Sequence, residues 1–260
     1  MAEAAPIQAP TDPRRFEVLV LNQISPNGLK KLPAERYRVG KESAQPDAIL
    51  LRSADLHAFA IAPSVVAIAR AGAGTNNIPV TLLTQRGVPV FTAPGANANA
   101  VKELVLAGIL LAARHICEAW DFARGLDLNG DELEKAVEQG KKRFIGHELP
   151  GRTLGIVGLG AIGVEVANAA HLLGMRVLGY DPQITVQRAW QLSSGVEQAL
   201  SLDDLFARSH AVSVHVPLTD GTRGLVSSKR LDLMPEGATV LNFARAAIVD
   251  EPAIVAERAS

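Results

Sequence analysis

The chain has 260 residues, of which 48% are hydrophobic and 20% are charged, and its formal net charge at pH 7 is −1. This composition excludes a chain that is disordered overall and is typical of one large or two modest folded domains. The balanced charge offers no basic field to nucleic acid or to an anionic membrane, and no apolar run reaches the roughly 18 residues of a membrane span, so we expect neither as a partner.

The N-terminus and the single cysteine indicate a cytoplasmic protein. Residues 1–15 contain three prolines and lack the basic and apolar regions of a secretory signal, so we expect a loose tail there. Cys117 cannot form a disulfide within the chain, and it lies in an apolar stretch where a buried thiol is the usual state. These features suit the reducing cytoplasm.

Residues 16–97 predict a first α/β domain with a parallel sheet. Short β-rich runs alternate with amphipathic segments, and this alternation is typical of parallel strands that are covered on both faces. The β-rich runs are 17–22, 47–51, 64–69 and 88–91, and the amphipathic segments between them include 26–32 and 78–86.

Two runs of this domain end in turns that suit an anion. Arg52 and Ser53 follow one run and the segment 70–74 follows the next, at the carboxyl edge where open α/β sheets bind ligands. Successive backbone N–H groups in the turn Gly72-Ala73-Gly74 would suit a carboxylate. Asn77 stands where a third glycine would be needed, so we expect no second dinucleotide site. The spacing alone fits equally well a surface cation and an ordinary turn.

A long helix is expected to connect this domain to a second one. Residues 101–124 follow the break at Pro94-Gly95 and have apolar cover along a helical pattern, so we take them as the crossover into a domain that covers 98–260. The elements expected in this second domain are strand 154–158, helix 161–173, strand 175–180, a variable stretch to 199, a helix starting at 203–204, and strands 211–215 and 238–242.

The most informative motif of the chain lies at the start of this second domain. The strand 154–158 leads directly into Gly158, Gly160 and Gly163, the G-x-G-x-x-G spacing, and a helix follows. In this motif the first glycine allows a tight turn, the second lets the backbone approach a pyrophosphate, and the third lets helix and strand pack closely. The helix start directs unpaired N–H groups at the phosphates. A glycine-rich turn without a ligand is the alternative.

An acidic residue sharpens this prediction to one cofactor. Asp181 follows the next strand, eighteen residues after Gly163. A carboxylate at this place would accept hydrogen bonds from a ribose 2′-hydroxyl and would repel a 2′-phosphate. The sequence therefore predicts an NAD site.

The carboxyl ends of two further strands are expected to face the cofactor crevice. One end carries His215, Val216 and Pro217, and the other carries the segment 242–245. For His215 a strand-end histidine bonded to backbone is favoured over proton transfer, because no acid that would orient the ring stands nearby in sequence. Arg245 is different, because a guanidinium beside a nicotinamide can hold a carboxylate bidentately and polarise the adjacent carbonyl.

Taken together, these stretches resemble the D-isomer-specific 2-hydroxyacid dehydrogenases. The resemblance spans almost the whole chain after Phe16, and it is more specific than the glycine motif alone. The stretches that carry it are LRSADL at 51–56, RAGAGTNNIPV at 70–80, PGANANAVKELVLAGILLAAR at 94–114, ELPGRTLGIVGLGAIG at 148–163, YDP at 180–182, HVPLTDGTRGL at 215–225 and NFARAAIVDE at 242–251.

The resemblance implies a fold and an activity. The fold is a flavodoxin-like substrate domain over 16–97 and a Rossmann-type NAD domain over 98–260. The activity is NAD-dependent interconversion of a D-2-hydroxy acid and its 2-keto acid, and the chain most resembles members that act on 3-phosphoglycerate and 3-phosphohydroxypyruvate in serine biosynthesis. The family is usually dimeric through the cofactor domain, which implies a homodimer. Glyoxylate and hydroxypyruvate reductases share this architecture, so the substrate stays open.

The resemblance also implies roles for single residues. Ala161, Ile162 and Asp181 would contact NAD, whereas Val216 and the segment Phe243-Ala244-Arg245 would line its nicotinamide end. Arg245 would be the catalytic arginine. The remaining implied residues belong to the substrate: Arg52 and Ser53 would hold its phosphate or carboxylate, and Ala73 and Gly74 would offer backbone donors near the hydride-transfer site.

One departure from the family pattern concerns the C-terminus. Family members continue past the segment 249–251 through two more strands, which carry a glutamate and then the acid/base histidine, and through a last segment that returns to the first domain. The six histidines here lie outside that pattern, at 57, 115, 147, 171, 210 and 215. We therefore expect a C-terminally truncated chain whose last Rossmann strands are missing and whose strand 239–243 is an unpaired apolar edge. It would be a fragment of a longer enzyme, or a non-catalytic cofactor-binding fragment or partner subunit.

Overall fold

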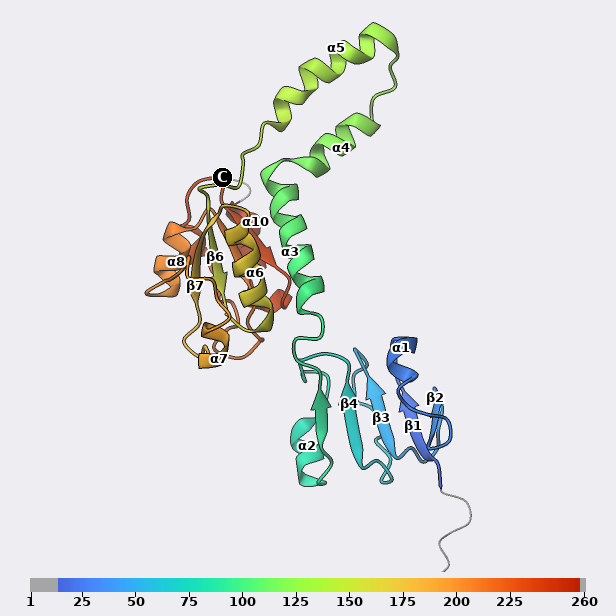
Figure 1. Ribbon diagram of the computed structural model, residues 1–260. Coiled ribbons are helices and arrows are strands. Elements are labelled where there is room, and N and C mark those ends of the chain that lie inside the picture. The colour runs from blue at the N-terminus through green and yellow to red at the C-terminus, as the bar shows by residue number, and fades with distance from the viewer. Residues whose placement is uncertain (1–13, 258–260) are drawn as a thin grey trace, which may run out of the picture. The chain divides into compact units, whose positions relative to one another are not determined.

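The computed structural model describes residues 14–257, and the chain divides into two compact units between Ala96 and Asn97. Each unit contains one five-stranded parallel sheet (Figure 1). The tail predicted over 1–15 lies outside the described residues except for Arg14 and Arg15.

The sheet of the first unit has the strand order β2-β1-β3-β4-β5. This is the flavodoxin-like order 2-1-3-4-5, so the predicted fold is confirmed for this unit. Its core consists of aliphatic side chains, and Leu51 and Ile68 are fully buried. The strands are β1 Phe16–Val20, β2 Tyr37–Gly40, β3 Ala48–Leu51, β4 Ala67–Arg70 and β5 Val90–Thr92, and the helices are α1 Pro26–Leu29 and α2 Val80–Gln85.

The sheet of the second unit has the order β10-β9-β6-β7-β8. Counted from its own first strand this is 5-4-1-2-3, which matches the first five strands of the Rossmann order and confirms that part of the predicted fold. Its strands are β6 Thr153–Val157, β7 Arg176–Tyr180, β8 Val196–Gln198, β9 Ala211–Val214 and β10 Thr239–Asn242. Its helices are α3 Ala98–Ala113, α4 Ile116–Arg124, α5 Gly130–Gly140, η1 Lys141–Phe144, α6 Ala161–Leu172, α7 Val186–Ala189, α8 Leu202–Arg208, α9 Ser228–Leu231, η2 Ala246–Ile248 and α10 Glu251–Glu257.

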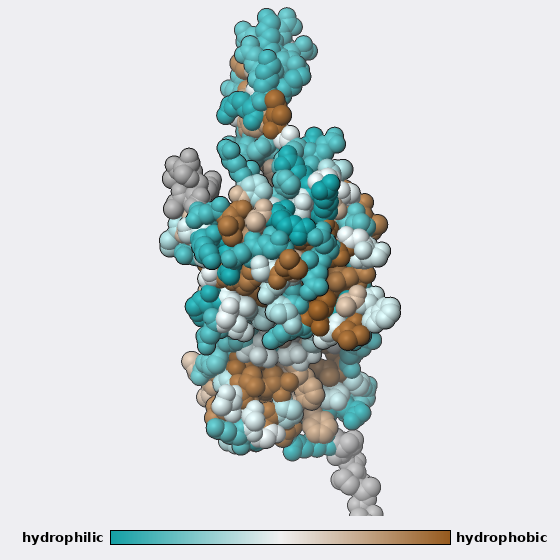
Figure 2. Space-filling model, turned by 90° about the vertical axis from the view of Figure 1, so that its left-hand side faces the viewer, coloured by the Kyte–Doolittle hydropathy of each residue, from teal (hydrophilic) through white to brown (hydrophobic). Residues whose placement is uncertain are grey.

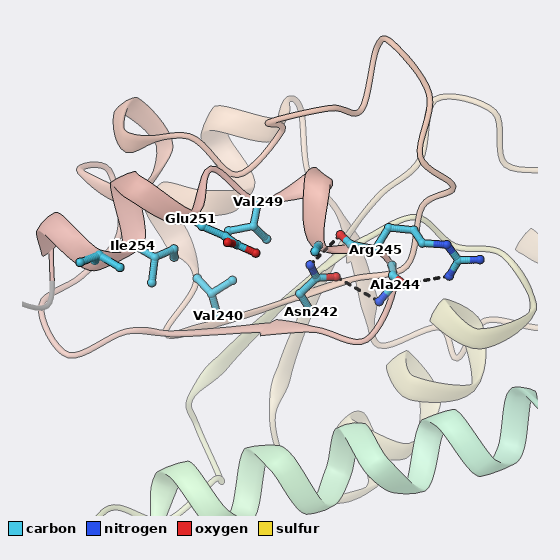
Figure 3. A pocket seen from close by; sticks show the side chains of 9 residues that line it. Val240, Asn242, Ala244, Arg245, Val249, Glu251 and Ile254 are labelled. Atoms are coloured by element: carbon cyan, nitrogen blue, oxygen red, sulfur yellow. Dashed lines mark hydrogen bonds between the residues drawn. The ribbon is translucent and has the colours of Figure 1, made fainter. Parts of the chain in front are cut away.

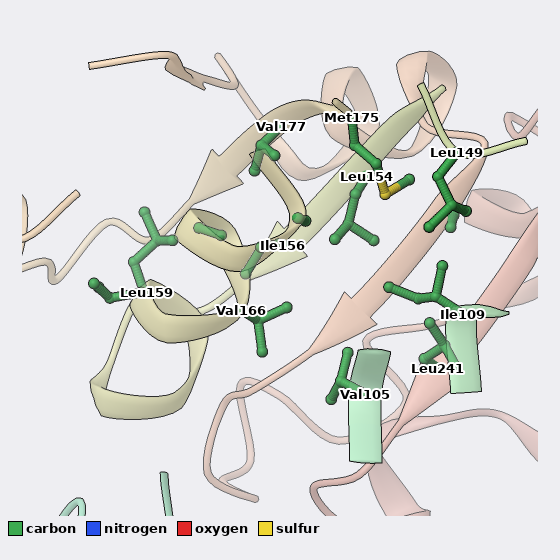
Figure 4. Packing of buried hydrophobic residues seen from close by; sticks show 14 of the residues in the cluster. Val105, Ile109, Leu149, Leu154, Ile156, Leu159, Val166, Met175, Val177 and Leu241 are labelled. Carbon is green, nitrogen blue, oxygen red and sulfur yellow. The ribbon is translucent and has the colours of Figure 1, made fainter. Parts of the chain in front are cut away.

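The core of the second unit explains why β6 occupies the middle of its sheet. All five residues of β6 are buried, as expected for a parallel strand that is covered on both faces. Leu154 and Ile156 pack on one side with Val105 of α3 and Val166 of α6 (Figure 4). The other side packs against α8, whose Phe206 is fully buried.

The sequence did not predict β2 and β8, and each of these strands lies at the edge of its sheet. β2 and β8 are short segments with the sequences YRVG and VEQ, which lack a continuous apolar run. The sequence predicts four strands in the second unit, and with β8 its sheet has five. The prediction that residues 239–243 form an edge is correct for the part of the chain that the structure describes.

The prediction of a single helix over 101–124 is wrong, because two helices occupy this segment. α3 ends at Ala113, and α4 starts after His115, which has a left-handed backbone with φ of 50°. The segment that leads from η1 back to the sheet caps the end of α3. In it, the backbone N–H of His147 donates to the Ala113 carbonyl at 2.8 Å. A Cβ on Gly146 would lie only 2.1 Å from that same oxygen, so glycine allows the close approach.

As a result of this break, α4 and α5 project from the body of the second unit (Figure 1). Phe122 of α4 packs against Phe144 and Arg143 of η1, which follows α5, and the centroids of the two phenyl rings are 5.4 Å apart. A Cβ on Gly140, the last residue of α5, would collide with the Phe122 ring. The surface of this arm is mostly hydrophilic with scattered apolar side chains (Figure 2). Cys117 lies on α4 and is exposed, so the prediction of a buried thiol is wrong.

No helix among residues 14–257 is both long enough and apolar enough to cross a membrane.

Candidate functional site

The glycine motif forms a tight connection between β6 and α6. Gly158 has φ of 92°, and a Cβ there would lie 2.9 Å from the His215 carbonyl oxygen, so both its backbone angle and its neighbours require glycine. A Cβ on Gly163 would lie 1.9 Å from the Gly158 carbonyl oxygen. A Cβ on Gly160 would meet nothing within 4 Å. Gly158 and Gly163 therefore allow close packing, whereas Gly160 faces open space.

The start of α6 places backbone N–H donors beside this open space. Gly160 is the N-cap residue, and the first intrahelical bond runs from the Val164 N–H to its carbonyl. The N–H groups of Ala161, Ile162 and Gly163 precede that bond and have no helical acceptor. Together with the helix dipole they form a site for an anion such as a pyrophosphate.

Asp181 ties the glycine loop to the end of β7. One of its carboxylate oxygens accepts a hydrogen bond from the Leu159 N–H at 2.9 Å, and the other accepts one from the Gln183 N–H at 2.9 Å. The residue is half-buried, and each oxygen keeps a further lone pair that can accept a hydroxyl. A pyrophosphate site and a free carboxylate acceptor at neighbouring strand ends fit a dinucleotide with an unmodified ribose.

His215 follows β9 and lies against the same loop. Its Nε2 atom is 2.9 Å from the hydroxyl of Ser213, which is fully buried, and burial lowers the pKa of His215 to about 4. The ring is therefore neutral at physiological pH. The sequence favoured a histidine bonded to backbone. The ring is instead paired with the Ser213 side-chain hydroxyl, and only the main-chain N–H of His215 bonds to backbone, at the Val157 carbonyl. Val216 contacts Gly158, since a Cβ on that glycine would lie 2.8 Å from its Cγ1 atom.

The turn after β10 presents Arg245 and is held by a residue that the sequence analysis did not single out. Asn242 accepts a hydrogen bond from the Ala244 N–H at 3.0 Å and donates one to the Arg245 carbonyl at 2.9 Å. The first contact is an Asx-turn, so an asparagine two residues before a turn position was the signal in the sequence. The Arg245 guanidinium donates to the Ala244 carbonyl.

A cavity of about 540 Å³ runs along the edge of β10 beside this turn. Val240 and Asn242 of β10 and Ile254 of α10 line it, and the Arg245 side chain extends away from them beyond the end of the strand (Figure 3). The Phe243 ring lies on the other side, against Gly108 of α3. Arg245 is thus directed toward the carboxyl edge of the sheet, where the glycine loop also lies.

The predicted substrate residues lie together at the carboxyl edge of the first unit. Arg52 and Ser53 are exposed, and among residues 14–257 no carboxylate pairs with Arg52. The turn of Ala73 and Gly74 is linked to them by Arg70, whose Nε atom donates to the Arg52 carbonyl at 3.0 Å. Within the described chain the N–H groups of Ala73 and Gly74 meet no protein acceptor.

A second cation lies on the other side of Arg52. Lys41 follows β2 and lines a cavity of about 1040 Å³ together with Arg52 and Asn22. Sequence analysis missed it because β2 was not predicted, and nothing else distinguishes Lys41 from other surface lysines. The unit thus offers two positively charged side chains and two N–H donors at one sheet edge, which suits a substrate with more than one anionic group.

Comparison with known proteins agrees with this geometry. The family model described as "D-isomer specific 2-hydroxyacid dehydrogenase, NAD binding domain" matches residues 106–259. A D-3-phosphoglycerate dehydrogenase of Archaeoglobus fulgidus is 38% identical over 237 residues, which are 88% of this chain and 42% of that protein. A hydroxypyruvate reductase of Thermotoga maritima is 37% identical over 190 residues, 73% of this chain and 56% of the relative. The chain thus spans less than half the length of the first of these relatives.

Solved structures give the same result. D-mandelate dehydrogenase from Rhodotorula graminis superposes with a TM-score of 0.77 and 26% identity over 95% of this chain and 78% of that one. An NAD⁺-bound 3-phosphoglycerate dehydrogenase from Entamoeba histolytica superposes with a TM-score of 0.70 and 25% identity, covering 95% of this chain and 77% of that one.

Two alanine substitutions in the glycine loop should separate binding from packing. Gly160→Ala should leave the free energy of unfolding unchanged and weaken NAD binding by about tenfold or more, because its methyl group would occupy the space that faces the pyrophosphate. Gly163→Ala should lower the free energy of unfolding by about 1–3 kcal/mol, since overpacking forces the backbone to move. Calorimetric titration and urea unfolding measure both effects. Equal NAD affinity of Gly160→Ala and wild type would contradict the role of this glycine.

Burial of neutral His215 predicts a pH dependence of stability. Its pKa is about 4 in the folded chain and 6.5 as the ordinary value, so unfolding takes up a proton between these limits. The stabilisation is fully present above pH 6.5 and is lost as the pH falls toward 4. Wild type should therefore lose about 2–3 kcal/mol more than His215→Gln between pH 7 and pH 4.5 in urea unfolding. Parallel curves for the two proteins would show that His215 is not buried in its neutral form.

Proposed function

The chain belongs to the family of D-isomer specific 2-hydroxyacid dehydrogenases, and we propose that it interconverts 3-phosphoglycerate and 3-phosphohydroxypyruvate with NAD, a step of serine biosynthesis. The observation that carries the substrate is that Arg52 and Lys41 line one cavity, at the sheet edge where the N–H groups of Ala73 and Gly74 have no acceptor among the described residues. A phosphate and a carboxylate on one small molecule match these two kinds of donor.

The residues of the second unit have separate tasks toward the cofactor. The α6 N-terminus and the open face of Gly160 hold the pyrophosphate, and the Asp181 carboxylate accepts the ribose hydroxyl. Val216, Pro217 and the turn 243–245 line the nicotinamide end. Bound NAD supplies the hydride acceptor for alcohol oxidation.

Arg245 acts on the substrate. Its guanidinium grips the carboxylate, and the positive charge polarises the neighbouring C2 carbonyl during reduction. In the oxidising direction the C2 hydroxyl loses a proton to a base while C2 gives up its hydride. His215 is unsuited as that base, because its Nε2 atom is paired with the Ser213 hydroxyl and desolvation lowers its pKa to about 4.

This property of His215 favours a second candidate function, NAD binding without turnover. On this account the chain binds NAD through the same residues but forms no NADH.

The helical arm and α3 support a partner as well. Apolar side chains on them are well exposed, namely Leu104 of α3 by 57% and Trp120 of α4 by 59%, and so is Ile145 just after η1, by 78%. Burying them against a second copy of the chain would remove this apolar surface from water, so we propose a homodimer through the second unit. We also assign the protein to the cytoplasm.

One kinetic experiment tests the function and distinguishes the candidates. NADH formation should be faster with 3-phosphoglycerate than with unphosphorylated D-glycerate by about 10–100-fold in kcat/KM, since a hydrogen bond to a charged group contributes about 1.5–3 kcal/mol. Arg52→Ala should remove most of this preference. Lys30→Ala, on the exposed surface of the same unit, serves as the control.

Two outcomes would overturn the proposal. NAD binding without NADH formation would support the second candidate function. Equal kcat/KM values for the two substrates would contradict phosphate recognition by Arg52 while leaving the dehydrogenase activity intact.

A further inference from the structure

The segment 52–54 is held on both of its sides by side chains from other parts of the first unit. On its carbonyl side Arg70 donates to the Arg52 carbonyl at 3.0 Å, and Asn77 donates to the Ala54 carbonyl at 2.7 Å. Asn77 is buried, and both of its recorded acceptors are carbonyl oxygens, so its amide nitrogen faces the turn.

The N–H side is held by one atom. The Asn22 side-chain oxygen accepts from the Ser53 N–H at 3.0 Å and from the Ala54 N–H at 2.5 Å. Because both partners are donors, the orientation of this amide follows from the contacts. The sheet register explains why Asn22 lies next to the Arg52–Ala54 turn. Val20 of β1 pairs with Leu50 of β3, so Asn22 and Arg52 both lie two residues beyond this pair.

The backbone of Asn22 is adapted to this task. Its φ is 68°, in the left-handed region that asparagine tolerates better than most residues. In this conformation the side chain reaches across a gap of 31 residues in sequence to the neighbouring strand end.

These bonds also determine what the turn can offer to an anion. The N–H groups of Ser53 and Ala54 are occupied by Asn22, and the carbonyls of Arg52 and Ala54 are occupied by Arg70 and Asn77. The Arg52 guanidinium and the Ser53 hydroxyl take no part in these bonds, so both can meet a ligand.

We propose that Asn22 is a positioning residue that fixes the Arg52–Ala54 turn and thereby sets where Arg52 and Ser53 meet the anionic end of the substrate. This inference rests on the proposed function and deepens it, because it names the side chain on which phosphate recognition depends. In this role Asn22 acts through the turn, whose Ser53 and Ala54 N–H groups it holds.

Three variants of the full chain test the proposal. Asn22→Gly keeps the positive φ at low cost and removes only the acceptor. Asn22→Asp keeps both the acceptor and the tolerance of this backbone. Gln23→Gly adds the same chain freedom one residue away, at an exposed side chain that makes no recorded bond within the described residues.

The readouts are amide hydrogen exchange and binding. In Asn22→Gly the Ser53 and Ala54 amides should exchange about fivefold faster or more, as expected for the loss of a hydrogen bond of about 1 kcal/mol. The Kd for 3-phosphoglycerate should rise about tenfold, and the Kd for NAD should stay within twofold. Asn22→Asp should exchange like wild type, and Gln23→Gly should match wild type in exchange and in both affinities.

Each other outcome contradicts the proposal. Unchanged exchange in Asn22→Gly would show that Asn22 does not hold the turn, and faster exchange with an unchanged Kd would show that the turn does not depend on Asn22 for binding. The same effects in Gln23→Gly would assign them to chain freedom. If wild type binds no 3-phosphoglycerate, the proposed substrate is wrong, whereas the exchange rates still decide whether Asn22 fixes the turn.

Discussion

The close approach of Gly163 to the Gly158 carbonyl is the contact on which the rest of the second unit depends. Any side chain at position 163 would collide with that oxygen, so α6 can start directly at the end of β6 only with glycine there. Gly158 of the same loop packs closely against His215 and Val216 at the end of β9. Asp181 at the end of β7 accepts a hydrogen bond from the Leu159 N–H of this loop. Three neighbouring strand ends are thereby joined around one helix start, and the N–H groups of that helix point into the space they leave.

Both units position charged groups by the same physical means. In each unit the side-chain amide of an asparagine hydrogen-bonds to the backbone of a turn, and the arginine side chain of that turn stays available for the ligand. Asn242 does this for Arg245, and Asn22 with Asn77 does it for Arg52. A flexible arginine loses much conformational freedom when it binds, so a turn that is already fixed reduces what remains to be ordered. Neutral His215 adds no competing positive charge beside the glycine loop.

The sequence predicts these features as far as they depend on local patterns. β6 and β9 are short runs in which apolar residues predominate, and the glycine spacing with Asp181 indicates both the dinucleotide site and its preference for NAD, which the family comparison supports. β2 and β8 are edge strands whose pairing depends on tertiary contacts, so their short sequences carry no clear signal. The break at His115 arises because a distant segment takes over the Ala113 carbonyl, and the exposure of Cys117 follows from that break. The site residues of the sequence analysis, Arg245 and Arg52 among them, stay predictions that binding and kinetics must test.

We propose that Asp181 selects NAD over NADP at the glycine loop. Its most direct test is the ratio of the dissociation constants for NADP and NAD, measured by calorimetric titration in wild type and in Asp181→Ala. Asp181 also holds the Leu159 N–H, so its loss loosens the loop for both cofactors, and only the ratio isolates the contact with the ribose. We expect the ratio to fall by about 10–100-fold in the variant, because a charged hydrogen bond to the 2′-hydroxyl and the repulsion of a 2′-phosphate disappear together. An unchanged ratio, with both affinities reduced by the same factor, would contradict the account.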